Sequence, residues 1–244
     1  MGGRAGGPSA LQSAMPDEAL PYRVKILDKT PLNHDVDRWT LERPDGYAYT
    51  PGQATSWAVD RDGLRDAPRP FTYTGLPDAP TLELVIKRYP SHDGVTDELS
   101  GVGPGEHFLM GEPRGDLTYR GPGTFIAGGA GVTPFLAMLR RLERDGELAG
   151  HRLIFANSTA ADVFLKDEFD RMLGERVHYR ISEDAPGFAT QGIVDRGYLS
   201  ATLSGFAEQW FYLCGPPSMG PAVYDDLIAL GAKDEHVVHV DWSD

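Results

Sequence analysis

The spacing of apolar residues changes near residues 119–123, and this change constrains the fold more than any other feature. Before it, segments rich in Val, Ile, Thr and aromatic residues alternate with turn sequences such as PDG and GVGPGE, a pattern typical of an antiparallel barrel or sandwich. After it, apolar strands alternate with amphipathic helices, as in βα units around a parallel sheet. We therefore predict two domains, an antiparallel β-barrel followed by an α/β domain with a parallel sheet.

The expected elements follow from apolar periodicity and turn signals. Residues 1–20 read as a flexible leader, 21–118 as the barrel and 119–244 as the α/β domain. Barrel strands are expected at 22–30, 37–44, 53–59, 70–75, 81–89 and 106–113, with a helix near 94–100. In the second domain, strands are expected at 124–129, 151–158, 177–182, 208–217 and 236–242, and helices at 134–146, 164–173, 195–203 and 219–231.

Composition narrows the class of partner. The 244 residues carry 23 Lys and Arg against 36 Asp and Glu, a net charge of −13 without a Lys/Arg cluster, which is unfavourable for nucleic acid or an anionic membrane. No apolar run approaches the ~20 residues that cross a bilayer, and no signal-peptide pattern opens the chain. The single cysteine, Cys214, excludes an internal disulfide and a Cys-ligated cluster or zinc finger. We expect a cytoplasmic monomer without a metal site.

The sequence AGGAGVTP, residues 127–134, lies between an expected strand and an expected helix. Glycines there allow the backbone to approach a ligand, and the free N–H groups at a helix start attract phosphate. Pro134 fits the first helical turn, where its missing N–H costs nothing. Because the spacing is not GxGxxG, a tight turn without a ligand is the alternative.

The sequence LCGPP, residues 213–217, ends a strand of the same expected domain. In a doubly wound sheet, the carboxyl ends of the strands form the ligand crevice. The alternative is a buried structural cysteine followed by prolines that only force a turn.

The sequence RPFTYTG begins at Arg69 in the expected barrel. Arg69 offers a fixed cation for a phosphate, Phe71 or Tyr73 can stack on a planar ring, and Thr72 can hydrogen-bond to it. An ordinary strand, in which alternating aromatic residues and Thr are common, is the alternative.

The order of four motifs is more informative than any one of them. RPFT, then GVT at residues 94–96, then GGAGVTP, then CGPP follow one another along the chain. In this order they resemble the ferredoxin–NAD(P)H reductase superfamily of flavoproteins, particularly its bacterial flavodoxin/ferredoxin-reductase-like branch. The resemblance covers roughly residues 20–244. It implies a barrel that binds FAD, an α/β domain that binds NAD(P)H, and electron flow from NAD(P)H through FAD to a separate acceptor.

The resemblance also implies roles for individual residues. Arg69 and Thr96 would hold the FAD pyrophosphate, Phe71 would pack on the flavin, and Thr72 would hydrogen-bond near flavin N5. Thr72 and Cys214 are the implied catalytic residues. The implied cofactor-binding residues are Arg69, Pro70, Phe71, Thr72, Tyr73, Thr74, Val85, Ile86, Lys87, Gly94, Val95, Thr96, Gly128, Gly129, Gly131, Val132, Thr133, Pro134, Asn157, Ser158, Cys214, Gly215, Pro216, Pro217 and Trp242.

The chain departs from the family pattern at three places. Phe71-Thr72 replaces the usual Tyr-Ser, which keeps a ring and a hydroxyl. Tyr73 stands where a small aliphatic residue is usual, so either ring can face the flavin. Many members end in an aromatic residue that covers the flavin, and Trp242 in VDWSD is the candidate here. Packing at the end of the last strand is the alternative for Trp242.

The nicotinamide preference depends on the positions after the second and third strands of the α/β domain. Members selective for NADPH tend to carry Arg or Lys there, whereas this chain reads ANSTAADVF and ISEDA. Glu183 and Asp184 would face a 2′-phosphate, and a like charge at a few ångströms costs on the order of 1–4 kcal/mol. We therefore predict a preference for NADH, which Arg152 or Arg180 could offset by swinging in.

The acceptor is left open by the sequence. With one cysteine there is no fused [2Fe–2S] module, so a ferredoxin, a flavodoxin, an oxygenase component, free flavin or a ferric complex must be external. An acidic chain repels acidic carriers unless a local basic patch forms, to which Arg61, Arg65, Lys87 and Arg88 could contribute. The alternative to an enzyme is a non-catalytic or complex-bound FAD-binding electron-transfer subunit.

Overall fold

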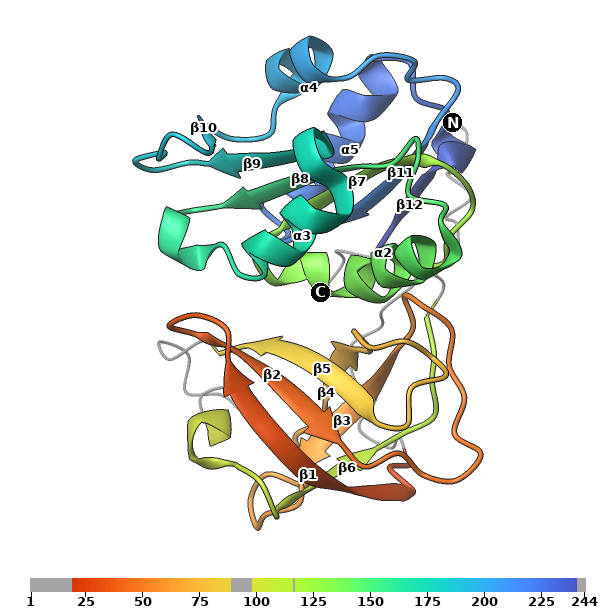
Figure 1. The fold of residues 1–244 in the computed structure, drawn as a ribbon, viewed down its shortest axis with the longest axis vertical. Helices are drawn as coiled ribbons and strands as arrows, with labels where there is room; N and C mark the ends of the chain where they lie inside the picture. Colours follow the sequence, from red (N-terminus) through yellow and green to blue (C-terminus); the bar gives the residue numbers. More distant parts are fainter. Residues whose placement is uncertain (1–18, 89–97, 116, 241–244) are drawn as a thin grey trace, which may run out of the picture.

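The computed structural model describes residues 19–88, 98–115 and 117–240, and it contains two separate sheets (Figure 1). The first is antiparallel, in the order β4-β3-β6-β1-β2-β5. An isolated bridge between Tyr73 and Leu84 joins the chain after β4 to β5, so this sheet nearly closes on itself. Its strands are β1 (Tyr22–Pro31), β2 (Val36–Leu41), β3 (Ala54–Val59), β4 (Arg69–Thr72), β5 (Leu82–Lys87) and β6 (His107–Met110), with the 3₁₀ helix η1 at Leu99–Gly101.

The second sheet is parallel throughout, in the order β10-β9-β8-β7-β11-β12. Its strands are β7 (Gly123–Gly128), β8 (Arg152–Asn157), β9 (Val177–Ile181), β10 (Thr190–Gln191), β11 (Trp210–Cys214) and β12 (Val237–His239). Its α-helices are α2 (Thr133–Asp145), α3 (Lys166–Leu173), α4 (Arg196–Thr202) and α5 (Gly220–Ala229), and its 3₁₀ helices are η2 (Gly129–Val132), η3 (Ala160–Asp162), η4 (Gly174–Arg176) and η5 (Asp234–His236).

Local sequence explains the main elements. All six residues of β7 are buried, as expected for a central parallel strand covered on both faces. Helix α2 has Pro134 in its first turn and ends at Gly146, whose φ of 75° allows a left-handed cap that returns N–H groups to the last carbonyls. The predicted fold class is confirmed. The two-residue strand β10 was not predicted, because Thr190–Gln191 carries no apolar pattern.

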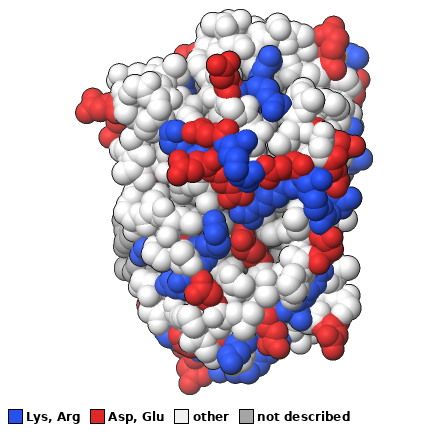
Figure 2. Space-filling model, viewed as in Figure 1, with Lys and Arg blue, Asp and Glu red and all other residues white. Residues whose placement is uncertain are grey.

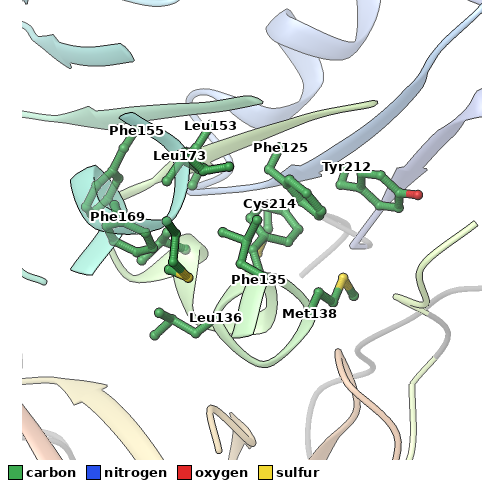
Figure 3. Close-up of a cluster of buried hydrophobic side chains, with 14 of the residues drawn as sticks. Phe125, Phe135, Leu136, Met138, Leu153, Phe155, Phe169, Leu173, Tyr212 and Cys214 are labelled. Carbon is green, nitrogen blue, oxygen red and sulfur yellow. The ribbon is translucent and has the colours of Figure 1, made fainter. Parts of the chain in front are cut away.

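Three apolar clusters hold the molecule together. One fills the barrel around Trp39, Trp57 and Phe108, and another packs α4 and α5 on one face of the parallel sheet. The third lies under α2 and α3 on the opposite face, where Phe125 stacks on Tyr212 with ring centroids 4.6 Å apart (Figure 3). Burial of each such side chain contributes about 1.5–3 kcal/mol.

The third cluster also joins the two sheets. It includes Val36 and Val85 from β2 and β5 together with residues of α2, so α2 is the helix that faces the barrel (Figure 1). The carboxyl ends of β7, β8 and β11 are thereby brought to the same side as β4 and β5. The domain boundaries at 20/21 and 118/119 stay a prediction.

Candidate functional site

A cleft of about 860 Å³ lies between the two sheets. Its size matches the range of sites for large organic ligands, and it opens at the carboxyl ends of parallel strands, as expected for this sheet type. Of the predicted site residues it is lined by Pro70, Phe71, Thr72, Val85, Ile86, Lys87, Gly128, Gly129, Gly131, Thr133, Pro134, Asn157, Ser158, Cys214, Gly215 and Pro216. Arg180, weighed from the sequence only as a cation for a 2′-phosphate, also lines it. The sequence did not single out the remaining lining residues Ala130, Ala156, Asp162, Ser182, Gly192, Ile193, Val194, Ser218, Met219 and Ala222.

On the barrel wall, strand β4 presents Phe71 and Thr72 to the cleft. Tyr73 does not line the cleft; it is fully buried and stacks on Tyr49 with ring centroids 4.1 Å apart. Its hydroxyl is paired with that of Tyr47. Of the two rings that the sequence left open, Phe71 therefore lines the cleft, whereas Tyr73 belongs to the barrel core.

Two other predicted residues of this segment lie outside the cleft. The buried hydroxyl of Thr74 donates to Glu83 Oε1 at 2.7 Å. Arg69 is exposed at the start of β4, where its guanidinium donates to the carbonyl of Pro68 at 2.9 Å. Neither side chain lines the cleft.

On the opposite wall, the glycine turn and the Cys-Gly-Pro-Pro turn are packed backbone to backbone. A Cβ on Gly131 would lie 2.3 Å from the Cys214 carbonyl oxygen, so only glycine fits there. Gly129 has a φ of 51° and open space where a side chain would be. Val132 is fully buried and anchors the turn in the apolar core. We find Val132 and Pro217 outside the cleft lining.

Cys214 ends β11 at the floor of the cleft and is 8% exposed. Burial raises the pKa of its thiol to about 12. The thiol is therefore neutral at physiological pH. Because the thiolate is the reactive form of cysteine, this thiol is a poor nucleophile. In Figure 3 it lies among the aromatic side chains under α2. This position suits a small, uncharged contact and not a nucleophile.

Comparisons with known proteins agree with this geometry. Residues 125–225 match the family model described as the oxidoreductase NAD-binding domain. The chain is 31% identical over 232 residues to NADH-cytochrome b5 reductase 1 of Pyricularia oryzae, covering 86% of this chain and 74% of that protein. The corresponding Arabidopsis thaliana protein is 29% identical over 229 residues, covering 86% and 80%.

The chain belongs to the ferredoxin reductase superfamily of FAD- and NAD-binding oxidoreductases. In fold it resembles a ferredoxin NADP+ reductase from Neisseria gonorrhoeae, solved with bound FAD and NADP, with a TM-score of 0.80, 18% identity, and coverage of 92% and 100%. It resembles the flavohem-like FAD/NAD binding domain of a Vibrio cholerae nitric oxide dioxygenase equally well, with a TM-score of 0.80, 22% identity, and coverage of 89% and 96%. The family prediction, with FAD and a nicotinamide dinucleotide as cofactors, is confirmed.

The residues of the cleft fit such cofactors. Asn157 at the end of β8 is 8% exposed, and neither its amide nitrogen nor its amide oxygen has a hydrogen-bond partner among the described residues. A buried amide without partners costs about 1–3 kcal/mol per unmade bond, so a polar ligand is the natural partner. Helix α2 continues the 3₁₀ helix η2, which starts on the same wall at Gly129 without a side-chain cap, and such an uncapped helix start can receive an anion.

The far end of the cleft differs from the sequence-based expectation. Ser182 lines it, whereas Glu183 and Asp184 are exposed and do not. Arg180 also lines it, held by a bond from its Nε to the Ile193 carbonyl at 2.9 Å and stacked 4.4 Å from the Tyr198 ring. The segment around Ile193 carries no motif, and its place beside β9 is set by tertiary packing alone.

Four predicted cofactor residues, Gly94, Val95, Thr96 and Trp242, lie outside the described residues. Residues 94–97 of the helix expected near 94–100 also lie outside them, and the described residues Leu99–Gly101 form the 3₁₀ helix η1. Among the described helices, none is both long and apolar enough to cross a bilayer.

Proposed function

We propose that this chain transfers electrons from NADH through FAD to a separate one-electron acceptor protein. One observation carries the proposal: a single cleft has Phe71 and Thr72 on the barrel wall and the glycine turn with Cys214 on the other. The flavin and the nicotinamide supply the hydride chemistry when bound. The chain's task is then to hold two flat rings against each other between these walls.

Each wall has a distinct part in this proposal. Phe71 packs against the flavin and the Thr72 hydroxyl hydrogen-bonds to it. The glycine turn receives the dinucleotide pyrophosphate at the start of α2, and the Asn157 amide gains the partner it otherwise lacks. The neutral Cys214 thiol contacts the nicotinamide without adding charge. Apolar Val85 and Ile86 exclude water from the same cleft, and no general base is required.

We propose NADH as the preferred donor. The curated relatives cited above are named NADH-dependent reductases. Glu183 and Asp184 directly follow Ser182, which lines the cleft, so their carboxylates would disfavour an added 2′-phosphate nearby. Arg180 is the opposing feature, although its bond to Ile193 and its stacking on Tyr198 restrain it. The kcat/KM ratio for NADH over NADPH tests this, and a ratio below one contradicts it.

For the acceptor, we propose a small haem protein of the cytochrome b5 type ahead of a ferredoxin or flavodoxin, because relatives are named for cytochrome b5. The four basic residues that the sequence suggested for an acceptor-binding patch are all engaged in ion pairs. Arg61, Arg65, Lys87 and Arg88 each pair with a carboxylate. In Figure 2, blue and red atoms are interleaved across the middle of the molecule.

The decisive experiment is an anaerobic titration of the purified protein with NADH and NADPH in parallel. Bleaching of the flavin absorbance by NADH supports the proposal, and absence of bleaching supports the non-catalytic FAD-binding subunit instead. Mass spectrometry of the released flavin distinguishes FAD from FMN. Stopped-flow reoxidation by cytochrome b5, a ferredoxin and a flavodoxin then ranks the acceptors, and faster reoxidation by a ferredoxin or flavodoxin contradicts the haem-protein assignment.

A further inference from the structure

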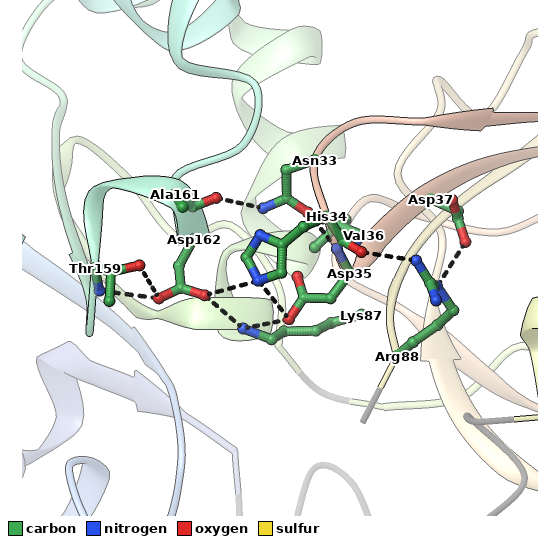
Figure 4. Close-up of polar contacts among 10 residues, drawn as sticks. All are labelled: Asn33, His34, Asp35, Val36, Asp37, Lys87, Arg88, Thr159, Ala161 and Asp162. Carbon is green, nitrogen blue, oxygen red and sulfur yellow. Dashed lines mark hydrogen bonds and ion pairs between the residues drawn. The ribbon is translucent and has the colours of Figure 1, made fainter. Parts of the chain in front are cut away.

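Beside the cleft, a polar cluster joins the barrel to the α/β domain (Figure 4). We call it the clasp, and it consists of Asn33, His34 and Asp35 from the β1–β2 loop, Lys87 at the end of β5, and Asp162 in η3. None of the four sequence motifs contains its loop or η3 residues.

The centre of the clasp is an ammonium group between two carboxylates from different domains. Lys87 Nζ lies 3.2 Å from Asp35 Oδ2 and 3.4 Å from Asp162 Oδ1. His34 Nε2 lies 3.5 Å and 3.7 Å from the same two oxygens. His34, Asp35 and Asp162 could by spacing hold a metal ion, but Lys87 already supplies the positive charge that the carboxylates need. We therefore assign the cluster to domain contact.

Hydrogen bonds to neighbouring residues fix the clasp on each side, at Asp162 in the α/β domain and at Asn33 in the barrel. Asp162 accepts hydrogen bonds from the Thr159 amide at 2.9 Å and the Thr159 hydroxyl at 2.8 Å. Asn33 Oδ1 accepts from the amides of Asp35 and Val36, while Asn33 Nδ2 donates across the domains to the Ala161 carbonyl at 3.0 Å. A displacement of η3 must therefore move the β1–β2 loop as well, or break these bonds.

The charges of the clasp are largely shielded from water. The side chains of Lys87 and Asp162 are 18% and 12% exposed, so their attraction is screened less than that of a surface pair. Burial alone would raise the pKa of Asp162, but hydrogen bonds from Thr159 and the charge of Lys87 lower it overall. The carboxylate is therefore ionised at neutral pH.

We propose that the clasp positions the two walls of the cleft relative to each other. Lys87 and Asp162 line the cleft, while Asn33 and His34 lie behind them and outside its lining. This inference rests on the proposed function, because two rings held by different domains react only when their atoms approach to about 3–3.5 Å. Asn33 and His34 are thus positioning residues that act through the domain contact.

The sharpest test is Asn33→Asp. The new carboxylate still accepts from the amides of Asp35 and Val36, so the turn is kept, but it cannot donate to the Ala161 carbonyl. We expect flavin reduction by NADH to slow about tenfold, since small misplacements of reacting groups are costly, with the KM for NADH less than doubled. A purely structural role would lower the yield of folded protein without this split between kcat and KM.

A readout independent of activity follows the domain contact directly. Spin labels on Asp45→Cys in the barrel and Lys233→Cys in the α/β domain, both exposed positions, report the distance between domains; native Cys214 is buried and its thiol neutral. Asn33→Asp should broaden the distance distribution. The matched control is Arg144→Gln, which breaks the exposed cross-domain pair with Asp78 away from the cleft and should leave both readouts unchanged.

If Asn33→Asp does not fold, Thr159→Val loosens Asp162 from the other side while keeping the backbone bond. Unchanged distances and unchanged flavin reduction in the folded variant would overturn the proposal. A wild-type flavin that NADH fails to reduce would instead refute the proposed function. The label distances would still show whether the clasp holds the domains.

Discussion

Among the ionic contacts between the barrel and the α/β domain, the one at Arg140 and the clasp are built differently. At α2, Arg140 donates through Nη1 to the Thr74 carbonyl at 2.7 Å and to Glu83 at 2.5 Å. Through Nε and Nη2 it donates to the two carboxylate oxygens of Glu168 at 2.6 and 3.0 Å. The corresponding contacts in the clasp are 3.2–3.7 Å long, and its His34 side chain is 55% exposed.

This difference in geometry indicates different roles for the Arg140 bridge and the clasp. Burial alone would lower the pKa of Arg140, but Glu168 and Glu83 raise it overall, and bidentate charge-assisted bonds of this kind are strong and geometrically specific. Arg140, Glu83 and Glu168 do not line the cleft, whereas Lys87 and Asp162 do. We infer that the Arg140 bridge mainly stabilises the contact between the two domains, whereas the clasp positions the two walls of the cleft.

The largest effect is expected from Arg140→Met. It removes the cation that both Glu83 and Glu168 contact most closely, and breaking a shielded pair of this kind costs about 3–5 kcal/mol. Chemical denaturation should show this as a lower midpoint. The control, Arg196→Met, breaks an Arg–Asp contact whose Arg is largely exposed and should cost about 1 kcal/mol or less. A loss for Arg140→Met no larger than the control would show that the Arg140 bridge is no stronger than an exposed ion pair.

Next comes Gly131→Ala, which acts on the cleft wall and not on either bridge. The added Cβ would meet backbone atoms of Cys214, and overpacking of this kind costs roughly 1–3 kcal/mol. We expect a matching fall in thermal stability together with impaired NADH binding by calorimetry. Gly187→Ala, where a Cβ would meet nothing within 4 Å, is the control. Wild-type affinity in Gly131→Ala would contradict the close contact.

Acid should weaken both bridges. Burial would raise the pKa of Glu168, but its bonds from Arg140 lower it overall, as happens to Asp162. A depressed carboxyl pKa contributes stability that is complete above its unfolded value, about 4, and is lost as the pH falls through the folded value. Glu168→Gln should therefore flatten the fall in denaturation midpoint below pH 4, and Asp162→Asn should do so less. Profiles parallel to wild type would refute the linkage.

The smallest effect is the change that the clasp variants are expected to cause in the reactivity of Cys214. With its pKa raised to about 12, roughly one thiol in 10⁴ is ionised at pH 8, so iodoacetamide should react at least a hundredfold more slowly than with an exposed Ser100→Cys. Loosening the clasp by Asn33→Asp should speed this reaction a few-fold, whereas Arg144→Gln should not. Equal acceleration of the iodoacetamide reaction in both variants would show that exposure of Cys214 does not depend specifically on the clasp.

Local pattern predicted the sheets but not their contact. The change of period near residues 119–123 and the turn sequences placed the strands and helices, because these depend on nearest neighbours. The bond from Asn33 to Ala161 joins residues 128 positions apart, and nothing in either local sequence requires it. The position of β10 beside β9 depends on tertiary packing in the same way.

The candidate site was predictable where a backbone demanded a residue type. Glycine at 131 and the turn after Cys214 fall into this class. Which of Phe71 and Tyr73 lines the cleft was not predictable. Both are aromatic and stand two positions apart, so strand alternation alone would put them on one face, but β4 ends at Thr72 and Tyr73 is buried in the barrel core. Arg180 was weighed as a cation for the 2′-phosphate, but its tether to Ile193 depends on a loop without a motif.

The absence of a side chain at Gly131 has a consequence for engineering. Because the turn after β7 rests directly on the carbonyl of Cys214, residues 128–134 and 214–217 behave as one unit split between two places in the chain. Exchanging either segment for that of another reductase should fail alone and succeed together. A working cleft wall is therefore best transferred between scaffolds by grafting the two turns as a pair.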